Sequence, residues 1–330
     1  MDIRNNILIL TLWYNANYGT ALQAYALQKA FECLCLRALH IVCVSFLKGD
    51  NTFPYKVIRQ ICHADSFENK ILDFYDNDII HVEEIFTKES LYRLSSISSN
   101  LVLGSDQVWN PTILNENSIY TTIHFPKSFK KYIYGAGVGV KDITSEFKKL
   151  LRNNLQNFIL CSCRDSWLPA SLEIDNADKL SVVADPVLLF DASFWLKESR
   201  PVFSIKNHYV LLYRLGNRPE IESYAKEIAN QQRLQLLDLS NIGMSTVGPR
   251  EFLWLISNAD YVVTDSYHGL LFSYVFNKTV KTFFKFDGGP LIQDNFRLQD
   301  ASESLKDKDN FRKLVDNSWM YLKRIVEHVR

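Results

Sequence analysis

The stretch from Ala259 to Lys278 constrains the fold of this chain more than any other part of the sequence. It begins with the aromatic and β-branched run Tyr261–Val263, and apolar residues then recur at helical spacing from Leu270 to Val275. A short run of the first kind is typical of a strand, and the second pattern is typical of a helix with one buried face. The stretch therefore predicts a strand, a tight turn and a helix.

The turn within this stretch carries helix-capping residues and a histidine. Thr264, Asp265 and Ser266 are cap-type residues, so free backbone N–H groups of the first helical turn should point beyond the carboxyl end of the strand. His268 lies in that first turn, and Gly269 lets a backbone or a ligand approach closely. These residues predict an anion site with an imidazole beside it. A purely structural hydrogen-bonding role for His268 is the alternative.

The amino-terminal segment has the same geometry. Ile7–Trp13 is expected to be a buried strand and Thr20–Cys35 a helix, and the turn between them contains Asn17 and Gly19. The turn lacks the G-x-G-x-x-G pattern, so it gives no indication of a dinucleotide site. The turn is therefore a glycine-containing connection from a strand to a helix N-terminus, like the turn before His268.

A third polar turn follows the short expected strand Asn100–Gly104. Residues 104–111 bring Ser, Asp, Gln and Asn side chains next to Trp109. Open α/β sheets bind ligands at the carboxyl ends of their strands, so this turn is expected to have a binding role. An ordinary turn built from Asp, Asn and Pro is the alternative.

The other elements alternate between strand and helix, with a pause near residues 180–205. Further strands are expected at Ile41–Phe46, Lys131–Gly139, Phe158–Cys161, Tyr209–Tyr213, Leu234–Leu239 and Val280–Phe284. Further helices are expected at Phe67–Tyr75, Lys88–Leu94, Glu146–Leu155, Glu220–Gln231, Pro249–Asn258 and Asn310–Val329.

Two successive strand–helix halves predict an α/β protein with two Rossmann-like, doubly wound domains that face each other across a cleft. The expected division is an amino-terminal domain at residues 1–190, a second domain at 191–309 that carries His268, and a helix at 310–330 that packs on the domains. By analogy, this is the glycosyltransferase-B (GT-B) type of architecture. Fold alone leaves the chemistry open.

Composition excludes several classes of function. Lys and Arg total 37, as do Asp and Glu, so no overall field attracts nucleic acid or an anionic membrane. No segment reaches the length of a membrane span, and the amino-terminal apolar run does not resemble a signal peptide. The cysteines lack C-x-x-C spacing and a matching histidine set, so we expect no metal site and reduced thiols in or near the core of a cytoplasmic protein. They are Cys33, Cys35, Cys43, Cys62, Cys161 and Cys163.

Four stretches together resemble the polysaccharide pyruvyl transferase family. They are Asn17–Gln23, Gly104–Asn110, Asp185–Leu189 and Thr264–Gly269, in the order in which the family shows them. The resemblance implies transfer of pyruvate from phosphoenolpyruvate to a sugar diol of a cell-surface polysaccharide precursor, with formation of a ketal and release of phosphate. It implies no cofactor, and an acceptor saccharide that is lipid-linked. The protein would then be cytoplasmic, and a peripheral position at the inner membrane is left open.

On the donor side, the resemblance implies that His268 is the general acid or the phosphate contact. Ser266, Gly269 and the helix N-terminus would hold the phosphate, and Arg214 is expected to make a fork-type contact with carboxylate or phosphate. Some family members carry an Arg at the position of Ser266. Either Ser266 and backbone amides suffice, with help from Arg214 or Arg164, or the donor differs. A structural ion pair is the alternative role for both arginines.

On the acceptor side, Asn17, Gly19, Asp106 and Trp109 are expected to receive the sugar. Asp106 would be the base for a sugar hydroxyl, and Trp109 would provide a stacking face. The sequence leaves two other functions open: a GT-B glycosyltransferase that uses a nucleotide sugar, and a non-catalytic saccharide-binding protein. No D-x-D pair is available to hold a metal for a nucleotide sugar.

Overall fold

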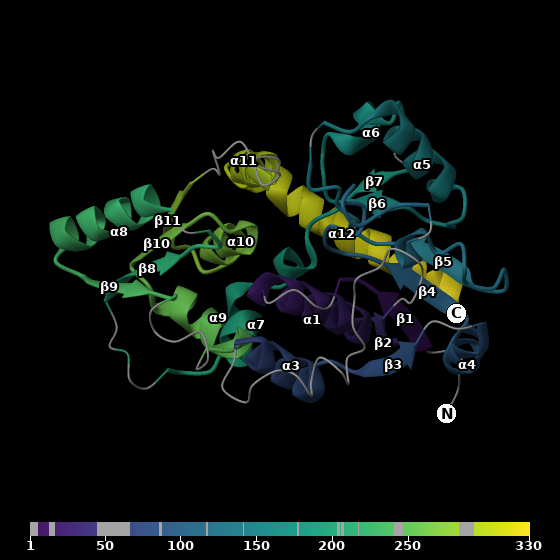
Figure 1. Cartoon of the computed structure of the whole chain (residues 1–330), viewed down its shortest axis with the longest axis horizontal. Helices are drawn as coiled ribbons and strands as arrows, with labels where there is room; N and C mark the ends of the chain where they lie inside the picture. Colours follow the sequence, from purple (N-terminus) through teal and green to yellow (C-terminus); the bar gives the residue numbers. More distant parts are fainter. Residues whose placement is uncertain are drawn as a thin grey trace.

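The computed structural model describes residues 6–12, 17–44, 67–85, 88–116, 118–140, 142–176, 178–202, 205, 208–216, 218–240, 247–283 and 294–330. It has two α/β lobes, each built on its own parallel sheet (Figure 1). Trp13, Phe46 and Phe284, at the ends of three expected strands, lie outside the described residues, as does Cys62.

The sheet of the first lobe has five parallel strands in the order β3-β2-β1-β4-β5. Because side chains alternate along a strand, Ile7 and Ile9 of β1 pack on one face of the sheet, whereas Leu8 and Leu10 pack on the other. Helix α1 covers the first face, and α4, α5 and α6 contribute to the core on the second. The strands are β1 Asn6–Leu10, β2 Arg37–Val44, β3 His81–Ile85, β4 Asn100–Leu103 and β5 Lys130–Ile133. The helices are α1 Tyr18–Cys33, α3 Phe67–Asp78, α4 Lys88–Ile97, α5 Ser145–Leu155 and α6 Leu168–Ser171.

The remaining part of this lobe is a two-stranded parallel sheet that leads toward the second lobe. Single bridges from Tyr132 to Leu160 and from Ala136 to Cys163 join the segment that contains its first strand to β5 and to the residues after β5. Its strands and the 3₁₀ helices of the lobe are β6 Ser162–Cys163, β7 Ser181–Val182, η2 Ile119–Thr121 and η3 Pro186–Leu189.

The sheet of the second lobe has four parallel strands in the order β11-β10-β8-β9. Helix α8 packs on one face of this sheet, and α9 and α10 pack on the other. The strands are β8 Tyr209–Tyr213, β9 Gln235–Asp238, β10 Tyr261–Thr264 and β11 Thr279–Thr282. The helices are α7 Ala192–Glu198, α8 Pro219–Gln232, α9 Pro249–Asn258, α10 Tyr267–Val275 and α11 Asp294–Ser304.

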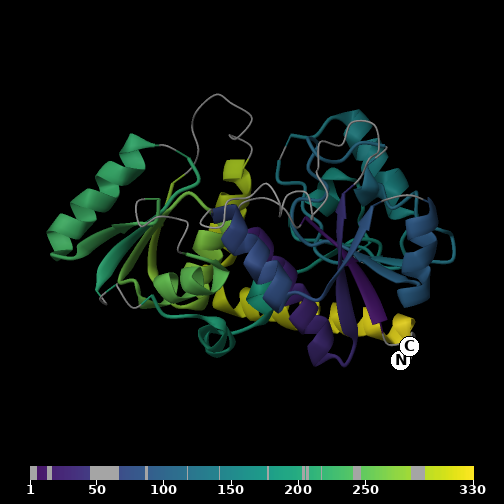
Figure 2. The ribbon, with the colours of Figure 1, turned by 60° about the horizontal axis from the view of Figure 1, so that its bottom comes forward.

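Helix α12, Lys308–Val329, runs along both lobes (Figures 1 and 2). Its first turns place Phe311 and Leu314 against the core of the second lobe, and its last turns place Ile325 and Val329 under the first sheet. The Tyr321 hydroxyl donates to the carbonyl of Ile133 at 2.8 Å, which fixes the helix to the end of β5. One helix is therefore shared by the two lobes.

The lobes also meet directly at the start of α1. The ring of Tyr18 stacks on that of Phe252 with centroids 4.5 Å apart, and its hydroxyl donates to the carbonyl of Val247 at 3.1 Å. Tyr18 is fully buried, and burial raises the pKa of its hydroxyl far above the ordinary value. The amino-terminal turn of α1 is thus inserted into the second lobe.

Most expected elements are present, and the differences have physical causes. Strand β8 and helix α9 have the predicted bounds. Strand β3 and helices α7 and α11 were not predicted; β3 carries two adjacent glutamates, and α7 is only seven residues long. Two of the described cysteines, Cys33 and Cys35, are exposed at the end of α1, so their expected place near the core was wrong. The domain boundaries stay a prediction.

Candidate functional site

Each lobe has a point where its strand order reverses, and ligands bind at such points in open α/β sheets. In the first sheet the chain runs outward from β1 to β2 and β3 and then returns to β4 on the other side of β1. In the second sheet it moves from β8 to β9 and then to β10 on the opposite side. The turns at these two points carry Gly19, Asp106, Arg214 and His268.

The turn after β10 is built for close packing at the start of α10. Ser266 caps the helix, and its hydroxyl oxygen accepts a hydrogen bond from the Gly269 N–H at 3.2 Å. A methyl group at Gly269 would lie 2.6 Å from Oγ1 of Thr264, which explains why glycine is needed there. The turn therefore holds His268 in a fixed place, with its side chain 5% exposed.

The turn before α1 is built in a similar way. The Asn17 side chain accepts a hydrogen bond from the Gly19 N–H at 2.8 Å and caps the helix. A methyl group at Gly19 would lie 2.0 Å from Nδ1 of His268, so the backbone of the first lobe lies directly against this imidazole. Two helix N-termini, one from each lobe, thus meet at His268. Their partial positive charges favour an anion there.

A chain of buried charged groups leads from His268 into the first lobe. Asp185 Oδ2 lies 3.7 Å from His268 Nε2 and 2.5 Å from an Arg164 terminal nitrogen. The other terminal nitrogen of Arg164 lies 2.9 Å from Asp106 Oδ1. Asp106 Oδ2 accepts a hydrogen bond from the Thr20 hydroxyl at 3.0 Å. One guanidinium thus joins the turn after β4 to the carboxylate that faces His268.

Burial and ion pairing shift the pKa values of Asp185 and Arg164 in opposite directions. Burial alone would raise the pKa of Asp185, but its contacts with His268 and Arg164 and the N–H of Val187 hold that pKa well below the usual range. Burial would lower the pKa of Arg164, but Asp185 and Asp106 raise it above the ordinary value. Asp185 is therefore a carboxylate and Arg164 a cation at neutral pH.

Arg164 and Arg214 are both paired in this structure. The guanidinium of Arg164 also lies over the ring of Tyr267, 5.1 Å from its centroid. Arg214, at the end of β8, contacts Asp238 at 3.2 Å and Glu222 at 3.3 Å. In this structure both arginines therefore form ion pairs, as the alternative to a donor-binding role expected.

Trp109 does not have the place expected of a sugar-stacking residue. Its side chain is fully buried in the core of the first lobe, and its backbone N–H donates to the Gly137 carbonyl at 3.0 Å. A ring with no exposed face cannot stack on a ligand, so the expected role for Trp109 is corrected to a core residue. The other predicted residues of the acceptor side, Asn17, Gly19 and Asp106, do lie together near His268.

Asp185 and Thr20 had no expected role, although both belong to the stretches that carried the family resemblance. Asp185 could have been suspected because it precedes Pro186 and caps η3, an arrangement that fixes its carboxylate. Its partners are distant in sequence: Arg164 is 21 residues away, and His268 belongs to the other lobe. Local patterns do not reveal such contacts.

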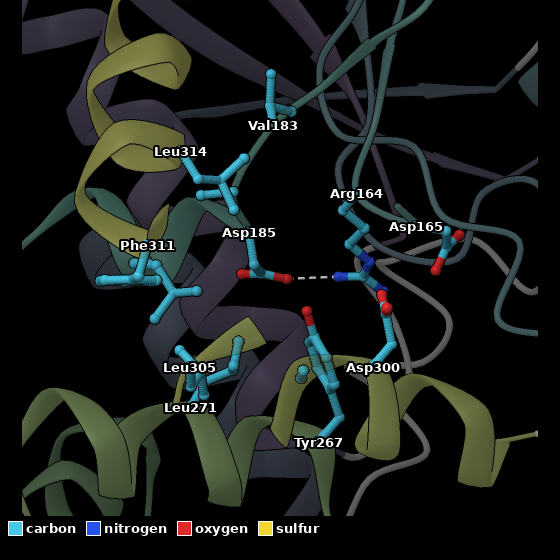
Figure 3. A pocket seen from close by; sticks show the side chains of 13 residues that line it. Arg164, Asp165, Val183, Asp185, Tyr267, Leu271, Asp300, Leu305, Phe311 and Leu314 are labelled. Atoms are coloured by element: carbon cyan, nitrogen blue, oxygen red, sulfur yellow. Dashed lines mark hydrogen bonds and ion pairs between the residues drawn. The ribbon is translucent and has the colours of Figure 1, made fainter. Parts of the chain in front are cut away.

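A cavity of about 50 Å³ is lined by both members of the Arg164–Asp185 pair (Figure 3). Arg164, Asp185, Tyr267 and Asp300 form its polar walls, and Leu305 and its apolar neighbours complete it. Its lining does not include His268. Because each ordered water needs roughly 10–15 Å³, the cavity has room for a few water molecules.

The described ranges contain neither a metal-binding cluster nor a helix that could span a membrane. Within them, no group of three or more His, Cys, Asp or Glu side chains is arranged to hold a metal ion. The helices in the part of the chain that the structure describes include none long and apolar enough to cross a membrane.

The family model described as polysaccharide pyruvyl transferase matches residues 17–280 of this chain. No curated protein sequence matches this chain. Among solved structures, the UDP-GlcNAc 2-epimerase of Neisseria meningitidis bound to UDP-GlcNAc is similar, with a TM-score of 0.52, 11% identity, and coverage of 98% of this chain and 99% of that chain. The UDP-GlcNAc 2-epimerase of Methanocaldococcus jannaschii has a TM-score of 0.52, 14% identity, and coverage of 98% and 99%. These likenesses confirm the predicted fold, two Rossmann-like lobes of GT-B type.

Proposed function

This chain belongs to the polysaccharide pyruvyl transferase family, and from that premise we propose that it transfers the pyruvyl group of phosphoenolpyruvate to two hydroxyls of a sugar. The observation that carries the proposal is the position of His268, against Gly19 and between the N-termini of α1 and α10. A donor with a phosphate and a carboxylate suits a place where two helix N-termini meet.

The reaction needs an acid, an anion site and a base. Protonation of the methylene carbon of the enol gives a methyl group and an electron-poor C2. One sugar hydroxyl adds to C2, phosphate leaves with the electrons of its C–O bond, and the second hydroxyl closes the ketal. Of the two hydroxyl protons, one replaces the proton given to the methylene carbon, and the other leaves with phosphate.

We assign His268 as the acid or phosphate contact, because its ring is the titratable group at the meeting point of the helix N-termini. Ser266, Gly269, Asn17 and Gly19 would shape the anion site. Asp106 would take a proton from a sugar hydroxyl, and Arg164 beside it would supply positive charge.

Arg214 would contact the donor from the neighbouring turn. Asp265 ties the two turns of the second lobe together, since its Oδ1 accepts from the Leu215 N–H at 2.7 Å. Because His268 is buried, the donor reaches it only when the contact with Gly19 opens. Arg214 would then have to exchange its present carboxylate partners for the donor.

Phosphate release tests the proposal. Purified protein with phosphoenolpyruvate and a galactose- or mannose-terminated acceptor should release phosphate, and His268→Ala should lower the rate at least ~100-fold, the usual scale for loss of an acid or base. His124→Ala is the matched control, because His124 is exposed and belongs to none of the turns that form the site. If His268→Ala kept the full rate, His268 would have no part in the mechanism.

Thermal-shift measurements separate the alternatives. Stabilisation by phosphoenolpyruvate supports the proposal, whereas stabilisation by nucleoside diphosphates alone would favour a glycosyltransferase. Binding of saccharides without turnover of any donor would indicate a saccharide-binding protein.

We further propose that the acceptor is lipid-linked and that the protein meets it at the cytoplasmic side of the inner membrane. Sedimentation with vesicles that carry such an acceptor tests this. Protein that stays in the supernatant at saturating acceptor would contradict it.

A further inference from the structure

We propose that Asp185 is a positioning residue that fixes the tautomer of His268, with the proton on Nε2 and with Nδ1 facing the bound donor. This inference deepens the proposed function and rests on it for its catalytic consequence. The geometry itself can be tested without any turnover.

The carboxylate of Asp185 is held from two sides. Its Oδ1 accepts from the Val187 N–H at 3.2 Å as it caps η3, and its Oδ2 accepts from Arg164 at 2.5 Å. The side chain is completely buried, so it has no freedom to rotate away. These contacts direct Oδ2 at Nε2 of His268, 3.7 Å away.

At 3.7 Å this contact is longer than a hydrogen bond, and the buried Nε2 has no hydrogen-bond partner among the residues that the structure describes. Because a carboxylate can only accept hydrogen bonds, the charge of Asp185 favours the tautomer that carries the proton on the nitrogen that faces it. The neutral imidazole of His268 then has its lone pair on Nδ1. That nitrogen lies on the side of Gly19, where the first turn of α1 begins. When the ring takes up a second proton, Nδ1–H points to the place where the two helix N-termini favour an anion.

The charge of Asp185 is secured by its surroundings. The charged or titratable groups packed around it and His268 include Arg164, which pairs with it, and Tyr267, whose ring lies edge-on to the imidazole at 5.1 Å between centroids. Tyr134 is buried beside them, and its hydroxyl donates to the carbonyl of Ala184 at 3.1 Å. Asp106 lies on the far side of Arg164. Asp106 and Asp185 share the single positive charge of Arg164, which leaves one net negative charge. Asp185 can therefore still stabilise an imidazolium at His268. A carboxylate that orients a catalytic imidazole in this way acts through the ring and does not touch the substrate.

NMR on the full chain with ¹⁵N-labelled histidine tests the proposal directly. The His268 signals are assigned by their loss in His268→Gln. In the unaltered protein we expect the neutral ring to be protonated at Nε2, with a proton that exchanges slowly with solvent because the side chain is only 5% exposed. In Asp185→Ala that proton should move upfield and exchange faster. Asp300→Ala is the matched control, because Asp300 lines the neighbouring cavity, whose lining does not include His268, and it should leave the signal unchanged.

Kinetics add the catalytic consequence. Asp185→Ala should lower kcat at least ~100-fold and leave the KM for phosphoenolpyruvate within a few-fold, because Asp185 acts on the donor only through His268.

Two results would overturn the inference: protonation of the neutral ring at Nδ1 in the unaltered protein, or an unchanged His268 signal in a folded Asp185→Ala. The first does not depend on Asp185→Ala, so it decides the matter even if that variant does not fold. An Nε2-protonated ring in a protein that never turns over phosphoenolpyruvate would leave the inferred geometry standing and remove the proposed function.

Discussion

The backbone of Gly19 lies directly against the imidazole of His268, so that even one methyl group at Gly19 would fall 2.0 Å from Nδ1. The two residues belong to different lobes, and each lies where a strand leads into a helix at the point of strand-order reversal, one after β1 and one after β10. Their contact joins two ligand-binding edges into one site.

This contact makes Gly19→Ala a sensitive probe of the site. The added methyl group must displace the His268 ring, so we expect at least ~10-fold loss of phosphate release together with a circular dichroism spectrum that does not change. Gly216→Ala is the control, because the nearest atom to its methyl group would be 3.7 Å away, an ordinary contact. Equal activities of the two variants would show that the packing of Gly19 on His268 is unimportant for catalysis.

Removal of the guanidinium of Arg164 should destabilise the protein strongly. Arg164→Met leaves Asp106 and Asp185 buried without their shared cation, and breaking a buried pair in this way costs about 3–5 kcal/mol of the free energy of unfolding. Arg152→Met removes a surface pair with Glu173 and should cost at most about 1 kcal/mol. Urea unfolding measures both, and similar losses in the two variants would contradict the buried network.

Trp109 should contribute to the stability of the fold and not to binding of the acceptor. Because its ring is fully buried, Trp109→Ala should cost about 3–5 kcal/mol of unfolding free energy. Trp109→Phe fills most of the same space and should retain the KM for the acceptor. An acceptor KM that rises tenfold or more in a stable Trp109→Phe protein would restore the stacking role.

His40 should make the fold sensitive to mild acid. Burial lowers the pKa of this histidine from 6.5 to about 3, so it stays neutral in the folded chain while the unfolded chain takes up a proton below pH 6.5. The contribution of neutral His40 to the free energy of unfolding is therefore complete above pH 6.5 and falls as the pH drops toward 3. From pH 7.5 to 5.5 this amounts to about 1.4 kcal/mol of unfolding free energy.

Urea midpoints at the two pH values measure this effect. His40→Leu should lose the corresponding part of the pH dependence, whereas the exposed His124→Leu should keep it. A pH dependence that is the same in all three proteins would show that His40 does not titrate as described.

Much of the fold follows from local patterns. The β-branched and aromatic runs Tyr209–Tyr213 and Tyr261–Val263 form central strands of the second sheet, where a continuous apolar run is buried on both faces. Pro249 at the first position of α9 marks the start of that helix. In contrast, β3 is an edge strand with the sequence HVEEI, in which polarity hides the strand pattern.

The site was only partly predictable. The turns at Gly19, Asp106 and His268 could be placed at strand ends, because their capping residues and glycines give local signals. Which of these turns touch is set by the packing of α1 into the second lobe, and no local pattern encodes that. The same is true of Arg164 and Trp109, since burial and pairing depend on partners far along the chain.

A crystal structure of the protein with bound phosphoenolpyruvate tests the central claim most directly. The account predicts density for the phosphate at the N-termini of α1 and α10, with one phosphate or carboxylate oxygen within hydrogen-bond distance of His268 Nδ1. Density for phosphoenolpyruvate at any other place, with the imidazole of His268 still closed against Gly19, would contradict it.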